Sequence, residues 1–403
     1  MTRTHDLPAL LTGIMATLAG IGVARFAYTP LLPALIEQQW FSASQAAYLG
    51  AANLLGYLIG ALTAHGLSER FPPRWVMAAA FAGIGLSFLA CATPGAIGWF
   101  FVWRLVSGVA GAILMVVGPA TALAATPPDR RATVGALVFT GIGLGALLSA
   151  TLVPLLLEVG LTATWLALGL LSLAAGMAGD RGVARLGEPA GIPHSASAPP
   201  AAARRLGTAA VLLVMAAYGL DAVGFVPHTV FWVDFLTREA GLGHGAASLQ
   251  WALFGVGAVA GPLLAGVVAR HLGWHVGLTL GFVIKAVAVA IPLLSLTLIG
   301  RSLSSLLVGA MIPALVALTS GRLAELVGPA AHKRLWGYAT AVFAAAQAIA
   351  GYAMSALYSA SGTYYPLFTL GSLALAAGVI LILLSRGGNA ASQPTAYLPT
   401  KER

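Results

Sequence analysis

The sequence predicts an all-α polytopic membrane protein with twelve transmembrane helices in two pseudo-symmetric six-helix bundles. Three observations predict this fold class: the composition, the number of long apolar stretches, and the distribution of basic residues. Of 403 residues, 59% are hydrophobic and only 8% are charged, whereas a soluble domain carries about 25% charged residues to face water. The chain therefore cannot cover a soluble surface. Its net charge of +9 is explained by basic loops at a membrane, and no nucleic-acid partner is expected.

The apolar stretches give the predicted helices in order, because about 20 apolar residues span a bilayer as one helix. Breaks between them fall at Pro, Gly or Arg, as in Arg70-Phe-Pro-Pro-Arg74 between the second and third spans. Arg3 ahead of the first apolar run would also fit a cleaved signal peptide, but the many later spans favour an uncleaved first helix. The twelve predicted spans are 9–34, 44–66, 75–92, 97–124, 132–157, 162–179, 208–233, 246–269, 275–296, 299–320, 336–358 and 364–384.

The positions of Lys and Arg predict the orientation, since cytoplasmic loops carry an excess of both. With both termini in the cytoplasm, all but five of the 21 basic residues fall on the cytoplasmic side. Two of the five, Arg238 and Arg301, lie on the outer side, and three lie within spans: Arg25, Arg104 and Lys285. This asymmetry supports both the helix count and cytoplasmic termini.

A segment rich in Pro, Ala and Ser divides the chain into related halves. It predicts a cytoplasmic linker at 181–207 between bundles at 1–180 and 208–386, with a cytoplasmic tail at 387–403. Gly22–Pro30 can be aligned with Gly219–Pro227, and Gly60–His65 with Gly266–His271. Matches at equivalent helices of two halves indicate a duplicated six-helix unit.

With twelve spans, a central linker and paired halves, the chain resembles the major facilitator superfamily. The fourth span reads Arg104-Leu-Val-Ser-Gly108-Val-Ala-Gly111, which is similar to that family's arginine and glycine motif. The loop after the eighth span, Gly266–Gly273, resembles its glycine-acid-arginine-glycine loop without the acid. The first span, with ARFAYTPLLP from Ala24 to Pro33, is most similar to the uncharacterised bacterial YbfB/YjiJ-like branch.

The resemblance implies the major facilitator fold and alternating-access transport of a small-molecule substrate. It also implies a monomer in the lipid bilayer of the bacterial inner membrane. The family's antiporter signature in the fifth span is not intact, because Pro154 lies well downstream of the glycines Gly141, Gly143 and Gly145. The departure from this signature puts an exchange or drug-efflux mechanism in doubt.

Two charges within the first helices of the halves are the main candidate site residues. An ionised side chain at mid-bilayer costs about 2.5–3.5 kcal/mol on insertion scales, so it normally faces a cavity or a partner. Arg25 lies in the first span and Asp221 near the matching position of the seventh. If these helices face each other, the two side chains would form a gate or a substrate-site pair. Asp221 is alternatively a titrating proton site.

Arg104 in the fourth span either contacts the substrate or donates hydrogen bonds to neighbouring helix carbonyls. Two arginines without an acid in the first half would suit a carboxylate, which a guanidinium grips in bidentate fashion. Lys285 lies in the ninth span, which in this fold tends to be peripheral; it either faces the interior or pairs with a backbone carbonyl. Tyr28, three residues after Arg25 in the first span, is included as a substrate-binding or gating residue.

The remaining candidates are polar or aromatic residues within spans. His228 is a proton relay or an interface histidine. The others either bind substrate or join helices by hydrogen bonds; they are Asn53, Tyr57, Trp251 and Gln347. Glycine pairs four residues apart, at Gly56, Gly141 and Gly257, predict either the interface between the bundles or ordinary close packing.

His271 and His275 have a spacing that could bind a metal, but no carboxylate or cysteine accompanies them, so no metal is expected. No cofactor is expected either, because no nucleotide-binding or hydrolase motif is present. The favoured function is proton-coupled transport of an organic anion, with Arg25 and Arg104 orienting the substrate and Asp221 as the coupling acid. The alternatives are multidrug or metabolite efflux and a non-transporting membrane sensor on the same fold.

Overall fold

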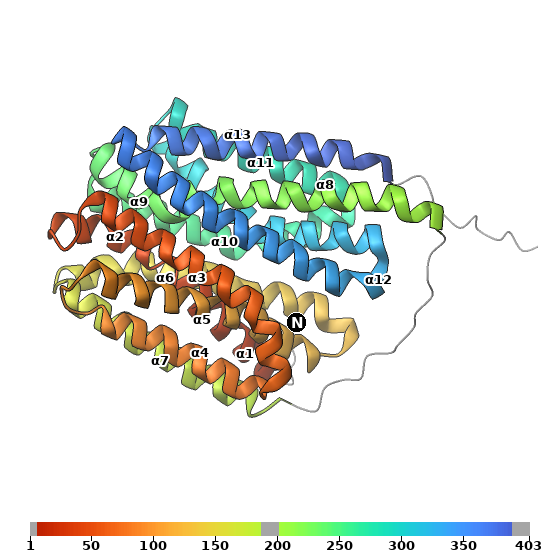
Figure 1. Ribbon diagram of the computed structural model, residues 1–403, viewed down its shortest axis with the longest axis horizontal. Coiled ribbons are helices and arrows are strands. Elements are labelled where there is room, and N and C mark those ends of the chain that lie inside the picture. Colours follow the sequence, from red (N-terminus) through yellow and green to blue (C-terminus); the bar gives the residue numbers. More distant parts are fainter. Residues whose placement is uncertain (1–5, 187–200, 389–403) are drawn as a thin grey trace, which may run out of the picture.

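The computed structural model describes residues 6–186 and 201–388, and all regular structure in these ranges is helical. Twelve helices in this part of the chain are long and apolar enough to cross a membrane. Residues 7–183 form what we call the N-terminal half and residues 201–384 the C-terminal half, and the two halves lie side by side (Figure 1). The end of the bundle where α1 begins and α13 ends is called the terminus end, at the right of Figure 1, and the opposite end is called the far end.

The N-terminal half contains six spans, of which the first is interrupted. It consists of α1 (Leu7–Thr17), the π-helix η2 (Leu18–Val23) and α2 (Tyr28–Glu37). A capping box of Ser42 and Gln45 begins the second span. The remaining helices are α3 (Ala43–Arg70), α4 (Pro73–Ala90), α5 (Ile97–Ala124), the short η3 (Pro128–Arg130), α6 (Arg131–Leu157) and α7 (Leu161–Val183).

The C-terminal half has the same outline, and its first span is also irregular near the far end. That span comprises α8 (Ala201–Val226), η4 (Pro227–Phe231), α9 (Trp232–Asp234) and η5 (Phe235–Glu239). The continuous element α12 contains two spans, because Gly328 with φ of 73° turns the chain at the terminus end. The other helices are α10 (Gly243–Leu272), α11 (Trp274–Leu294), α12 (Leu298–Ser361), α13 (Tyr365–Leu384) and η6 (Ser385–Gly388).

The glycine pairs pack helices within each half and do not form the interface between halves. A Cβ on Gly56 or Gly60 would lie 2.1 or 2.3 Å from a carbonyl oxygen of α5, and one on Gly257 or Gly261 would lie 2.1 Å from a carbonyl oxygen of α12. Gly141 meets α1 in the same way. Of the two interpretations made from the sequence, close packing within a half is therefore the correct one.

This packing also corrects one of the two alignments between the halves. Gly60 lies against α5, whereas no atom is within 4 Å of a Cβ on Gly266. The residue that repeats the environment of Gly60 is Gly261, on the carbonyl of Ala310. The alignment of Gly60–His65 with Gly266–His271 is thus out of register with the packing.

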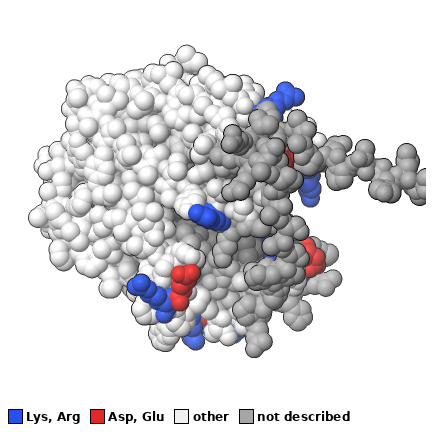
Figure 2. Space-filling view, turned by 45° about the vertical axis from the view of Figure 1, so that its right-hand side comes forward, with Lys and Arg blue, Asp and Glu red and all other residues white. Residues whose placement is uncertain are grey.

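The surface agrees with a membrane location. In Figure 2 a broad area carries no charged side chain, and the visible Lys, Arg, Asp and Glu gather toward the terminus end. Of the predicted linker at 181–207, residues 187–200 lie outside the described part, and its two ends belong to α7 and α8. The predicted tail at 387–403 lies outside the described part from residue 389 on.

Candidate functional site

All nine candidate residues from the sequence are buried in the structure. Their exposed fractions do not exceed 8%. The structure distributes them over neighbouring groups and not over a single cluster. These groups are Arg25 with Tyr57 and Gln347; Arg104 with Tyr28 and Asn53; Asp221; His228; and Trp251.

Arg25 lies between the two halves. It follows η2, and its Nη1 donates a hydrogen bond of 3.0 Å to Oε1 of Gln347 on α12 of the other half. Its guanidinium carbon lies 4.4 Å from the ring centroid of Tyr57 and 5.6 Å from that of Phe225. The aromatic faces attract the cation, but no carboxylate among the described residues forms an ion pair with it.

The polar atoms that lack a partner at this position are all donors. Nε and Nη2 of Arg25 and Nε2 of Gln347 are buried and form no hydrogen bond within the described part of the chain. Guanidinium and amide nitrogens donate and do not accept. Buried donors without an acceptor are costly, so the group that would satisfy this site is an acceptor, and a negatively charged one would also compensate Arg25.

Arg104 stabilises the break in the first helix. Tyr28 N donates to Arg25 O, not to the carbonyl of Ala24 as in a regular helix. The Ala24 oxygen instead accepts from Nη1 of Arg104 at 3.1 Å, Nδ2 of Asn53 at 3.3 Å and Oγ of Ser107 at 3.4 Å. We call this arrangement the Ala24 clamp. A carbonyl freed inside a membrane protein must find such donors.

The first helix comes close enough for this clamp because of glycine. A Cβ on Gly22 would lie 2.6 Å from Cα of Gly145 on α6, and one on Gly20 would lie 2.8 Å from the carbonyl oxygen of Gly111 on α5. Arg104 also lies over the ring of Tyr28, at 4.2 Å. The hydrogen bonds to a helix carbonyl are the second of the two alternatives that the sequence left open for Arg104.

Asp221 is paired with Lys285, not with Arg25. Nζ of Lys285 on α11 donates to Oδ1 of Asp221 on α8 at 2.5 Å, and both side chains are essentially inaccessible, at 0% and 1% exposure. The expectation of a direct Arg25–Asp221 pair is therefore not met. Lys285 faces the interior, which is the first of the two alternatives that the sequence left open for it, and its partner is a carboxylate and not a backbone carbonyl. Its Nζ lies 5.8 Å from the ring centroid of Phe225.

Phe225 lies near two charged groups. The guanidinium carbon of Arg25 lies 5.6 Å from its ring centroid, and Nζ of Lys285, which is part of the ion pair, lies 5.8 Å from the same centroid. Phe225 comes from α8, one turn after Asp221. A single aromatic side chain therefore contacts the unpaired cation and the ion pair.

His228 and Trp251 have partners inside the protein. Nε2 of His228 lies 2.8 Å from Oγ of Ser304, whose hydrogen is directed to a backbone carbonyl of α11 at 2.7 Å. Ser304 therefore accepts, and Nε2 of His228 carries the proton. Nε1 of Trp251 donates across the halves to Oγ of Ser149 at 2.9 Å.

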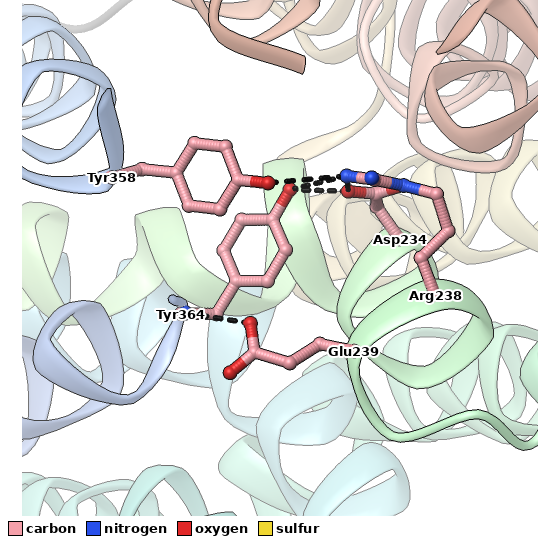
Figure 3. Close-up of polar contacts among 5 residues, drawn as sticks. All are labelled: Asp234, Arg238, Glu239, Tyr358 and Tyr364. Carbon is pink, nitrogen blue, oxygen red and sulfur yellow. Dashed lines mark hydrogen bonds and ion pairs between the residues drawn. The ribbon is translucent and has the colours of Figure 1, made fainter. Parts of the chain in front are cut away.

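A polar cluster at the far end was not predicted. Figure 3 shows Arg238 lying against Asp234, with two hydrogen bonds of 2.5 Å, and against the hydroxyls of Tyr358 and Tyr364. Tyr364 also donates to Asp234, and its backbone N–H donates to Glu239. The cluster ties the end of the seventh span to the α12–α13 turn. The spacing of Asp234 and Arg238, four residues apart on one helix, is the signal that could have identified it.

The buried charges of the described residues do not balance. Each of the three buried carboxylates has a basic partner; the pairs are Asp6–Arg130, Asp221–Lys285 and Asp234–Arg238. Of the four buried bases, Lys285 and Arg322 contact acids. Arg25 and Arg104 contact only neutral groups. The excess of buried charge at the junction of the halves is therefore positive.

Contacts between the halves gather toward the far end. Besides Arg25–Gln347 and Trp251–Ser149, three further hydrogen bonds cross the interface there. They join Thr29 to the Thr229 carbonyl at 2.5 Å, Ser44 to Ser359 at 2.6 Å and Glu37 to His244 at 2.8 Å. The structure is thus a conformation in which the halves are closed at the far end.

Among the described residues no group of three or more His, Cys, Asp or Glu side chains could hold a metal ion. The twelve membrane-spanning helices and the two side-by-side halves define the class as the major facilitator fold. The family described as "Uncharacterised MFS-type transporter YbfB" matches residues 17–383, and the chain belongs to this family.

Two curated proteins are similar to parts of the chain. The uncharacterized transporter YgaY of Escherichia coli O157:H7 is 28% identical over 179 residues, which are 43% of this chain and 45% of that protein. The gallate transporter of Pseudomonas putida is 34% identical over 149 residues, which are 36% of this chain and 32% of that protein. The chain thus matches less than half the length of each relative.

Proposed function

We propose that the chain is a secondary transporter that moves a small organic anion across the membrane by alternating access. The anion's carboxylate binds between Arg25 and Gln347. The observation that carries this proposal is the uncompensated Arg25 at the junction of the halves, where the unpartnered polar atoms are donors only. A carboxylate supplies both the missing acceptors and the missing negative charge.

The family and the relatives support this proposal at a coarser level. The family is one of MFS-type transporters, and one relative is named a gallate transporter. We extend the proposal to cytoplasmic termini, on the asymmetry of Lys and Arg. We also extend it to a monomer in the bacterial inner membrane, as the resemblance to the family implies. In that orientation the closed far end is the periplasmic side, so the conformation described above is closed toward the periplasm.

Asp221 is the candidate for proton coupling. Protonation of Asp221 would break its ion pair and leave Lys285 charged beside Phe225, whose ring also contacts Arg25. The electrostatic environment of the anion site would then depend on the protonation of Asp221. An approaching anion would favour the state in which Lys285 is unpaired, and this links proton uptake to substrate binding.

Efflux of lipophilic cations is less well supported, because recognition of a cation needs an available acid. The three buried carboxylates among the described residues already have basic partners. A sensor on the same fold would bind the anion without moving it. Transport in sealed vesicles distinguishes that class from a transporter.

The test uses purified protein reconstituted into proteoliposomes, with uptake of radiolabelled carboxylates measured under an imposed proton gradient. Arg25→Gln is expected to abolish uptake, because it removes the positive charge that would bind the carboxylate. The glutamine amide can still donate hydrogen bonds, so the loss is attributable to the charge. Arg334→Gln is the matched control, since Arg334 is exposed and lies near Tyr338 away from this site. Uptake of carboxylates by Arg25→Gln at the rate of the unmodified protein would contradict the proposal, as would binding without any uptake.

Coupling is tested separately with Asp221→Asn. This variant is expected to lose accumulation driven by the proton gradient while it retains exchange of labelled for unlabelled substrate, because exchange needs no net proton movement. Undiminished accumulation by Asp221→Asn would remove Asp221 from the coupling step and leave the anion site unaffected.

A further inference from the structure

Phe26, the residue after Arg25, fills an aromatic slot on the other half. Its ring centroid lies 5.6 Å from that of Trp251 and 5.4 Å from that of Phe254, and the rings meet edge to face at 83° and 85°. Trp251 and Phe254 are stacked at 4.4 Å on α10. Phe225 adds a third wall at 6.5 Å. These separations are typical of favourable aromatic pairs.

The slot and the cation site adjoin each other. Phe225 is a wall of the slot and also lies 5.6 Å from the guanidinium of Arg25. The three walls belong to the C-terminal half, whereas Arg25 and Phe26 belong to the N-terminal half. Movement of the halves away from each other must therefore take Phe26 out of the slot and Arg25 away from Gln347 together.

We propose that the transported anion is a carboxylate attached directly to an aromatic ring. Its carboxylate binds Arg25 and Gln347, and its ring enters the slot formed by Phe225, Trp251 and Phe254. This inference rests on the proposed function and narrows its substrate class. The protein itself supplies both parts in the closed structure, the amide oxygen of Gln347 as the acceptor and Phe26 as the ring.

Two properties of the site favour an aromatic ring over an aliphatic chain. Edge-to-face contacts with Trp and Phe stabilise a ring by more than its buried area alone, and an aliphatic chain gains only the area term. A ring also keeps its carboxylate in one plane and direction, so less conformational freedom is lost when both ends are bound. The slot and Arg25 together thus select for a planar, singly charged ligand.

The test compares four probes on the unmodified full chain by isothermal titration calorimetry in detergent. They are benzoate, cyclohexanecarboxylate, hexanoate and benzyl alcohol. Benzoate is expected to have a Kd about 2- to 10-fold lower than cyclohexanecarboxylate, as the contribution of aromatic pairs implies. Benzyl alcohol, which keeps the ring and lacks the charge, is expected not to bind at millimolar concentration.

Variants then assign the preference to the slot. Phe254→Leu is expected to remove the preference for benzoate over cyclohexanecarboxylate and to keep carboxylate binding. Phe88→Leu is the matched control, because Phe88 is equally buried but packs on Trp165 within the N-terminal half, and it should retain the preference.

The outcomes separate this inference from the proposed function. Equal affinity for benzoate and cyclohexanecarboxylate would overturn the aromatic inference and leave the anion transporter standing. An aromatic preference that persists in Phe254→Leu would overturn the assignment to this slot. Failure of the three carboxylates to bind would overturn both proposals.

Discussion

Lys285 and Asp221 form an ion pair of 2.5 Å between α11 and α8, and neither side chain is more than 1% exposed. The pair lies within the C-terminal half, while Arg25, which also lies near Phe225, forms no ion pair with a described carboxylate. Removing one member of a buried ion pair is strongly destabilising, because the other charge stays buried without compensation. The pair therefore makes the stability of this half depend on two residues at once.

Removal of one member of this pair is expected to destabilise the protein more than removal of both. Lys285→Gln or Asp221→Asn alone should lower the free energy of unfolding by about 3–5 kcal/mol, because the charge of the remaining partner is then buried without compensation. The double variant should recover much of the loss. The melting temperature of purified protein measures this, and additive losses would contradict a direct interaction.

Gln347→Glu is expected to place a carboxylate of the protein itself in the anion site beside Arg25. The new carboxylate would lie where Oε1 of Gln347 now accepts from Arg25 at 3.0 Å, and a charge-assisted bond is stronger than a neutral one. The melting temperature should rise, and stabilisation by added carboxylates should disappear.

Gln250→Glu is the matched control for that variant. Gln250 is also fully buried on a neighbouring helix, but its partners are Ser302 and Ser305, not a cation. It should lower the melting temperature. A decrease of similar size in both variants would mean that Arg25 is not available to an added carboxylate.

A disulfide between residues 44 and 359 is expected to hold the far end closed. The hydroxyl oxygens of Ser44 and Ser359 lie 2.6 Å apart across the halves. Oxidised Ser44→Cys/Ser359→Cys protein should lose transport, and reduction should restore it. Each single cysteine variant is the control, and full transport by the cross-linked protein would contradict movement at this end.

The natural cysteine should not interfere with that experiment. Cys91 is fully buried, and burial raises the pKa of its thiol to about 12. The thiolate, which is the reactive form, is therefore scarce at neutral pH. Maleimide labelling of the folded protein should be negligible from pH 6 to 9 and complete after denaturation. Rapid labelling of the native protein at pH 7 would show that Cys91 is accessible.

Arg104→Ala is expected to destabilise the N-terminal half by about 1.5–3 kcal/mol, the range for a hydrogen bond to a charged group. The Ala24 carbonyl would lose its 3.1 Å donor. Ser107→Ala removes a longer bond of 3.4 Å to the same oxygen and should cost less. Equal melting temperatures for Arg104→Ala and the unmodified protein would contradict a structural role.

The fold class followed from composition and hydropathy, because a membrane admits few alternatives to helices of about 20 apolar residues. Residues such as Arg25 and Asp221 were recognisable for the same reason, since a charge within a span is costly. The partner of each was not recognisable. It depends on the rotation of helices about their axes, which placed Lys285, and not Arg25, opposite Asp221.

The interruption of the first helix could also not be predicted from the sequence. It depends on contacts of Gly20 and Gly22 with two other helices and on three donors that reach one carbonyl. None of these contacts follows from local pattern, because glycine and alanine are abundant throughout the chain. The pair of Asp234 and Arg238 was by contrast present in the local spacing.

The Ala24 clamp has a mechanical consequence. Arg25 is joined by a single peptide bond to a residue that α3 and α5 both hold through Asn53, Arg104 and Ser107. The backbone beside Arg25 is therefore fixed to α3 and α5 and moves with them. A change in the distance from Arg25 to Gln347 thus reports a displacement of one half relative to the other.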